Sequence, residues 1–299
     1  MNTVRTVFGT LWRGIVVGIA YIFAMMLAGI VFGVLGLMPA ASGDAASSLL
    51  WTLIAGILLG LFLGPLAART PATRRQHMLI WTAVIFFNIG AVALEGAYFA
   101  PDLVPIPLPL LAVQQALAAL VAGGLIALLF AQRGQTAAFL ETLHRRPWFA
   151  WLWRFLLASF SYLAFYLVFG ALNYNLVTEP YYTAHAGGLT APDTLTVLSV
   201  ELIRAPLLVL SIVLLILASH TTRRRVVIIA GTTLFWVGGI VPLTLQIGSL
   251  PAPLLLASAV EIFLQNFLTG AVAAWLFWTQ RTGELPAASD TKRLHPLPD

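Results

Sequence analysis

The sequence predicts an all-α polytopic membrane protein with eight transmembrane helices in two tandem four-helix halves. Of its 299 residues, 60% are apolar and only 9% are charged, whereas a soluble globular protein carries about 25% charged residues. Eight segments are long and apolar enough to cross a bilayer, and short motifs of the first half recur in the second. Together these observations exclude a soluble globular fold.

The composition also excludes several classes of site. The chain contains no cysteine, so disulfides, iron–sulfur clusters and thiolate-bound metals are excluded. The single lysine, Lys292, lies in the tail, which rules out a P-loop. The net charge of +5 would suggest nucleic acid in a soluble protein, but we attribute it to membrane orientation and expect no nucleic-acid partner.

The transmembrane segments follow from length and hydropathy. A membrane-spanning helix needs about 20 mostly apolar residues. The first segment has an apolar run far longer than the roughly 7–15 residues of a signal peptide, so we expect it to be retained. The predicted spans are 11–38, 48–68, 77–98, 108–132, 148–175, 195–219, 225–247 and 252–280.

The basic residues predict the orientation. Fifteen of the sixteen lysines and arginines fall on one side of the predicted spans, and the sixteenth, Arg204, lies inside the sixth span. The loops on the other side contain neither residue type: they are 39–47, 99–107, 176–194 and 248–251. Because basic residues concentrate on the cytoplasmic side, we predict a cell (inner) membrane protein with both termini in the cytoplasm.

An internal repeat predicts how the spans are grouped. Short motifs recur in the same order: Leu11-Trp12-Arg13 as Leu152-Trp153-Arg154, Arg74-Arg75 as Arg223-Arg224, and Pro107-x-Pro109-Leu-Leu as Pro251-x-Pro253-Leu-Leu. Four spans per half is an even number, so the repeat is parallel, with a pseudo-twofold axis along the membrane normal.

The repeat divides the chain into four regions. We predict membrane halves at 1–132 and 148–281, joined by a cytoplasmic interfacial linker at 133–147. The tail, 282–299, is rich in proline, alanine and charge, and we expect it to be disordered.

A glycine strip in the second span predicts close helix packing. Gly56, Gly60 and Gly64 are four residues apart, and small residues at this spacing let another helix backbone approach. We favour packing within the chain, and a homodimer interface is the alternative.

Ionisable residues inside the spans indicate a candidate site, because such residues are costly in hydrocarbon. At 1.5 Å per residue, Glu95 and Arg204 lie about 25 and 22 Å above the cytoplasmic ends of their spans. Glu261 lies about 10 Å below the outer end of the eighth span, and Gln115 of the fourth span is at a similar depth. These residues occupy the outer third of the bilayer, so we predict a polar cavity open to the extracytoplasmic side.

Each charged residue has a structural alternative. Glu201 and Arg204 are at i,i+3 and can form an ion pair, whose only role would then be structural. Glu261, with Gln265 at i+4, either pairs across helices with Arg204 or is protonated, and the alternative is a hydrogen-bonded structural acid. Glu95 is nearer the surface, and the alternative is simple exposure to water.

The loop 176–194 is the longest on the outer side and contains Tyr181 and Tyr182. It can fold over the cavity as a lid, with the tyrosines as amphipathic contacts. The alternative is a loop whose tyrosines are anchored among lipid headgroups.

No enzyme motif emerges. The only histidine within the predicted spans is His77, at the cytoplasmic end of the third, and no G-x-S-x-G occurs, so we lean against an enzyme and expect no cofactor and no metal. The leading hypothesis is a transporter-like protein for a small solute or lipid headgroup. One alternative is a non-catalytic subunit of a membrane complex, and another is an intramembrane enzyme acting on lipid.

Overall fold

The computed structural model describes residues 2–37, 45–101, 106–131, 146–219 and 221–279. Over these residues the protein is helical apart from short connections, and it contains no β-strand. Eight helical segments are long and apolar enough to cross a membrane. The described part of the chain therefore has the architecture of a multi-pass membrane protein, which confirms the all-α class and the eight spans.

The spans begin and end close to the predicted positions. The seventh consists of α9, the π-helical turn η3 and α10. The helices of the eight spans are α1 (Asn2–Val34), α2 (Ala45–Arg69), α3 (Arg74–Phe99), α4 (Leu108–Phe130), α6 (Trp148–Asn173), α8 (Thr194–Ala218), α9 (Arg223–Phe235), η3 (Trp236–Ile240), α10 (Val241–Leu245) and α11 (Ala252–Phe277).

Local sequence explains where two of these helices begin. The Thr73 side chain accepts from the Gln76 backbone and the Gln76 side chain accepts from the Thr73 backbone, a capping box at the start of α3. Asp193 precedes α8, and its carboxylate accepts from the backbone N–H groups of Leu195 and Thr196, both at 3.0 Å. Both caps satisfy backbone donors that a helix N-terminus leaves free.

The predicted loop 176–194 is wrong in its first half. The fifth span continues beyond α6 through the π-helical turn η1 (Tyr174–Thr178) into α7 (Glu179–Thr183), so the helical segment ends at Thr183. Pro180 has no N–H to donate to the preceding turn, and the π-helical turn η1 lies directly before α7. The short 3-10 turn η2 (Ala186–Gly188) follows.

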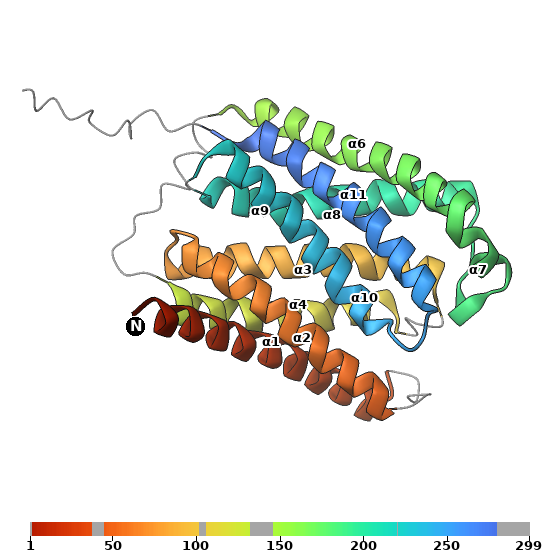
Figure 1. Ribbon diagram of the computed structural model, residues 1–299, viewed down its shortest axis with the longest axis horizontal. Helices are drawn as coiled ribbons and strands as arrows, with labels where there is room; N and C mark the ends of the chain where they lie inside the picture. The colour runs from red at the N-terminus through yellow and green to blue at the C-terminus, as the bar shows by residue number, and fades with distance from the viewer. Residues whose placement is uncertain (1, 38–44, 102–105, 132–145, 220, 280–299) are drawn as a thin grey trace, which may run out of the picture.

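The helices form one elongated bundle with the connections at its two ends. The start of α1 and the start of α6 lie at one end, and α7 lies at the other (Figure 1). Among the first four spans, α1 packs on α2 and α4, and α3 packs on α4. Among the last four, α6 packs on α8 and α11, and α9 packs on α11.

The glycines of α2 lie directly against α1. A Cβ added at Gly60 would lie 2.0 Å from the backbone oxygen of Gly14, and one at Gly18 would lie 1.9 Å from that of Gly56. A Cβ at Gly64 would be 3.0 Å from Cα of Gly14. The two backbones are therefore in contact, and the strip is occupied by a helix of the same chain.

The first four and last four spans meet through α3 against α8 and through α2 against η3 and α10 (Figure 1). The Trp236 indole N–H donates to the Leu58 carbonyl at 3.0 Å, and its ring stacks on Phe62 with centroids 5.1 Å apart. One continuous apolar core includes Trp81 of α3 and Leu208 of α8. Most of the predicted linker 133–147 and all of the tail 282–299 lie outside the described residues.

Candidate functional site

Arg204 forms an ion triad with two carboxylates from different helices. Its Nη2 lies 2.7 Å from Oε2 of Glu95 on α3, and its Nη1 lies 3.1 Å from Oε1 of Glu201, one turn earlier on α8. The i,i+3 spacing places Glu201 and Arg204 on one face of α8, which is the face packed on α3. The triad therefore joins the first four spans to the last four.

The triad is buried at its centre and open at one member. Arg204 is 1% exposed and Glu201 is fully buried, whereas the Glu95 side chain keeps 25% of its surface exposed. A buried charge is tolerated when it is paired and hydrogen-bonded. Glu95 is thus an ion-pair partner whose side chain the protein leaves partly uncovered, so simple exposure does not describe it.

Two tyrosines of α6 complete the surroundings of Arg204. The guanidinium carbon lies 5.6 Å from the ring centroid of Tyr162 and 5.9 Å from that of Tyr166. A cation this close to an aromatic ring is attracted by its quadrupole, more strongly when both are desolvated. Sequence reasoning did not select either tyrosine, although their spacing of four residues puts them on one helix face.

Glu261 lies on α11 and is held by neutral amides. Its Oε2 accepts a hydrogen bond from Nδ2 of Asn173, and its Oε1 accepts one from Nε2 of Gln265 at 2.7 Å. Across the helix contact lies Gly170 of α6, where an added Cβ would be 3.3 Å from Oε1. The ion pairs of Arg204 are made with Glu95 and Glu201, so the hypothesis that Glu261 pairs with Arg204 is not realised.

Gln115 belongs to a separate polar cluster between α1 and α4. The Tyr21 hydroxyl donates to Gln115 Oε1 at 2.7 Å, and Gln115 Nε2 donates to Met25 Sδ at 3.0 Å. The neighbouring Gln114 donates to the Met25 carbonyl at 2.8 Å. The structure therefore places Gln115 in a polar cluster of its own and does not bring it to the ion triad.

Tyr181 and Tyr182 lie in the segment that covers the C-terminal end of α3. Both pack against a small apolar cluster of Ala100, Leu189 and Leu254. The chain then returns to α3, where the Thr190 N–H donates to the Phe99 carbonyl at 2.9 Å. This segment is thus attached one turn from Glu95, and its tyrosines contact protein.

A third polar cluster lies deeper in the bundle, beside the π-helical turn η3. Asn266 of α11 donates from Nδ2 to the Leu234 carbonyl at 3.0 Å. Asn88 of α3 is fully buried, and within the described residues neither of its amide atoms has a hydrogen-bond partner. A Cβ added at Gly238 would lie 2.2 Å from Asn88 Oδ1. Single π turns are frequent at functional sites, and the Gly238-Gly239 pair is the signal that sequence reasoning missed.

The described residues contain no group of three or more acids or histidines arranged to hold a metal ion. Comparison with known protein families, curated proteins and solved structures finds no match for this chain. A function must therefore be argued from the geometry and chemistry of the site itself.

Proposed function

We propose that the protein is a transporter-like carrier whose outer polar layer receives a small solute or lipid headgroup. The observation that carries this proposal is the Glu95–Arg204–Glu201 triad, in which residues of the first four spans and the last four spans share one buried charge network. Intramembrane ionisable residues commonly mark the path of a transported solute or ion. A network divided between two packed units is also the kind of contact that a relative movement can make and break.

The charge balance of this layer favours a cationic solute or a proton as the transported or coupling species. The layer contains three carboxyl groups (Glu95, Glu201 and Glu261) but one guanidinium, Arg204, which among the described residues pairs only with Glu95 and Glu201. Glu261 is bound only by neutral amide donors, so it is available to exchange a proton or to receive a positive group. Glu95 retains partial exposure and supplies the approach from the outer end.

We also propose that the two sets of four spans arose by duplication. In each set the first span packs on the second and the fourth, and the third packs on the fourth. Gly29 of α1 faces Gln114 of α4, and Gly170 of α6 faces Glu261 of α11. The contacts between sets are reciprocal, with α3 against α8 and α2 against α10. This pattern supports a pseudo-twofold axis along the membrane normal, about which the halves would rock.

The direction of the cycle follows from orientation. Fifteen basic residues on one side of the spans support cytoplasmic termini in a cell membrane. The acidic layer, formed by Glu95, Glu201 and Glu261, then faces the extracytoplasmic side, and the segment with Tyr181 and Tyr182 acts as its outer cover. A solute would displace this cover, weaken the contact between Glu95 and Arg204, and leave toward the cytoplasm once the halves have moved.

Reconstitution tests the proposal across several classes of solute. The purified chain is placed in liposomes loaded with a pH-sensitive dye, and small amines, cationic and zwitterionic amino acids and sodium salts are added outside one at a time. We expect a solute-dependent pH change that E261Q and R204A abolish while both variants remain folded by gel filtration. E179Q is the matched control, because Glu179 is an exposed glutamate at the same end of the bundle.

Two results would contradict this function. Equal fluxes in E261Q, R204A and wild type would remove the acidic layer from the transport path. A stoichiometric second protein retained through purification in mild detergent, with no flux for any solute, would instead favour a subunit of a membrane complex.

A further inference from the structure

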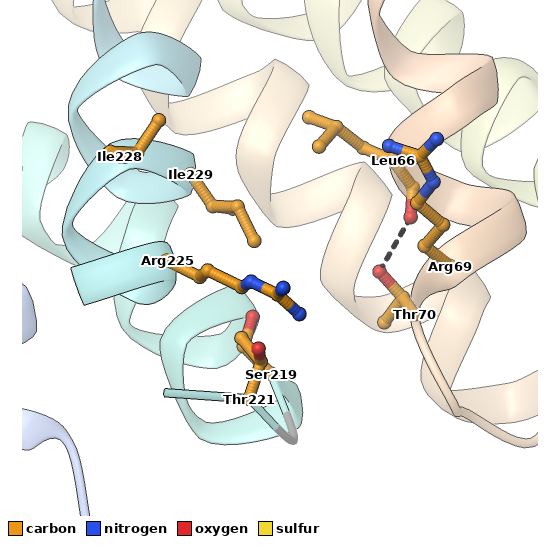
Figure 2. Close-up of a pocket in the computed structure, with 8 residues that line it drawn as sticks. All are labelled: Leu66, Arg69, Thr70, Ser219, Thr221, Arg225, Ile228 and Ile229. Atoms are coloured by element: carbon orange, nitrogen blue, oxygen red, sulfur yellow. Dashed lines mark hydrogen bonds between the residues drawn. The ribbon is translucent and has the colours of Figure 1, made fainter. Parts of the chain in front are cut away.

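At the arginine-rich end of the bundle, opposite the acidic layer, the structure has a cavity of about 570 Å³ (Figure 2). It lies between the C-terminal end of α2 and the N-terminal part of α9, with Ser219 and Thr221 beside it. Residues from both sets of four spans therefore form its walls: Leu66, Arg69, Thr70, Ser219, Thr221, Arg225, Ile228 and Ile229.

Two arginines from opposite walls give this cavity its charge. Both arginines line the cavity and are exposed. In Figure 2 the Arg225 side chain extends beside Ser219, and the Arg69 side chain lies on the facing helix. Neither guanidinium has a hydrogen bond or an ion pair to any described residue. Each therefore retains its full set of N–H donors for a ligand, and two such forks are the usual means of binding phosphate.

The surroundings contain no described acid that neutralises these arginines. The acidic residues of the described part of the chain lie at the other end of the bundle: Glu95, Glu179, Asp193, Glu201 and Glu261. Arg225 also follows Arg223 and Arg224 in the first turn of α9, which has no acid and no side-chain cap. Cations at the positive end of a helix dipole are unfavourable, and a bound anion would offset this effect.

The remaining wall indicates what kind of anion fits. Leu66, Ile228 and Ile229 line the cavity, and Ile228 is 46% exposed on the bundle surface, where a membrane protein meets lipid. The hydroxyls of Thr70 and Ser219 donate to backbone carbonyls of the preceding helical turn. They add polarity to the wall, and the N–H donors available to a phosphate are those of the arginines. An apolar wall beside paired arginines is suited to a ligand with a phosphate and an acyl chain.

We propose that this cavity binds the phosphate group of an anionic phospholipid between Arg69 and Arg225. The part of the acyl chains nearest the headgroup would then lie along Ile228. Basic pockets between transmembrane helices on the cytoplasmic side recognise such headgroups. Because Arg69 belongs to α2 and Arg225 to α9, the lipid joins the two sets of spans. The site stands independently of the transport proposal.

The test is native mass spectrometry of the full-length purified chain with added lipid. Wild type should bind one phosphatidylglycerol about tenfold more tightly than phosphatidylcholine, which corresponds to about 1.4 kcal/mol. R69Q/R225Q should lose this preference. R74Q/R75Q is the matched control and should retain it, because both arginines are exposed at the same end and the charge change is identical.

Further arms separate a lipid from a soluble phosphate. Inorganic phosphate or glycerol phosphate at millimolar concentration should not displace phosphatidylglycerol, and I228N should weaken the lipid by severalfold. Displacement by free phosphate with no effect of I228N would overturn the lipid assignment in favour of a soluble phosphate. Equal loss in R69Q/R225Q and R74Q/R75Q, or no preference in wild type, would show that the cavity has no specific role.

Discussion

Removal of Arg204 should destabilise the protein more than any exposed charge change, because two carboxylates lose their common partner. Glu201 is fully buried, so R204M leaves it uncompensated at 3.1 Å from where the guanidinium was. Breaking a buried ion pair on one side costs about 3–5 kcal/mol. At about 2 °C per kcal/mol for a chain of this size, the midpoint of thermal unfolding should fall by about 6–10 °C.

A double-mutant cycle isolates the pair. E201M/R204M removes both charges, and replacing a buried pair by apolar side chains of similar volume is often nearly neutral. The midpoint of E201M/R204M should therefore recover the part of the loss that comes from Glu201, while Glu95, whose side chain is 25% exposed, stays without its partner. E201M alone should cost less than R204M, since Glu95 still binds the guanidinium at 2.7 Å.

The assay is thermal unfolding in mild detergent, followed by the fluorescence of the nine tryptophans. E179Q serves as control and should stay within about 0.5 kcal/mol of wild type, because exposed sites rarely contribute more. The reasoning would be refuted if R204M unfolded at the same temperature as E179Q. It would also be refuted if E201M/R204M lost as much stability as the two single variants together.

Three further predictions concern the scaffold. G60A should lower the free energy of unfolding by about 1–3 kcal/mol through overpacking, because its Cβ would lie 2.0 Å from the Gly14 carbonyl oxygen. G33A is the control: its Cβ would have open space around it, so it should be nearly neutral in the same unfolding assay. W236F should keep the stack on Phe62 but lose the 3.0 Å bond to Leu58, at a cost of about 1 kcal/mol; no change in the unfolding midpoint would argue against this contact between the halves. The hydrogen bond from the Thr196 hydroxyl, followed by the backbone hydrogen bonds, lowers the pKa of Asp193 below its ordinary 3.8. The stability that this cap gives to α8 is therefore fully present above pH 3.8 and is lost as the pH falls through the lower pKa of the folded protein. D193N should therefore remove this part of the acid dependence of unfolding, and an unchanged pH profile would contradict it.

The all-α class and the eight spans could be predicted from the sequence because the length and hydropathy of a span are local properties. Eight apolar segments of membrane length indicated eight helices, and the pairing of Glu201 with Arg204 followed from i,i+3 spacing. Contacts between helices carry no such local signal. The partnership of Glu95 with Arg204 depends on how α3 packs on α8, and the position of Gln115 beside Tyr21 depends on α1 against α4.

The errors near α7 and around Arg204 have a similar cause. Residues 176–183 were read as a loop because the apolar run ends there, yet the helix continues through a π-helical turn. The tyrosines around Arg204 and the Asn88–Asn266 region were missed because single polar residues in apolar helices are identified as partners only when the neighbouring helix is known. Glu261 lies on the eighth span, and its partners Asn173 and Gln265 are amides, which sequence reasoning did not single out as a pair around it.

The proposed carrier function is tested most directly by measuring whether the acidic layer, formed by Glu95, Glu201 and Glu261, can be reached from the aqueous phase. The chain lacks cysteine, so a single introduced thiol reports only its own position. In G170C the side chain would point at Glu261, while V260C, one residue from Glu261 and 62% exposed on the bundle surface, would face lipid. A charged, membrane-impermeant thiol reagent added outside proteoliposomes, with the orientation of the chain measured separately, should modify G170C and leave V260C unmodified. Protection of G170C, or equal reaction of both, would contradict a solute-accessible polar layer.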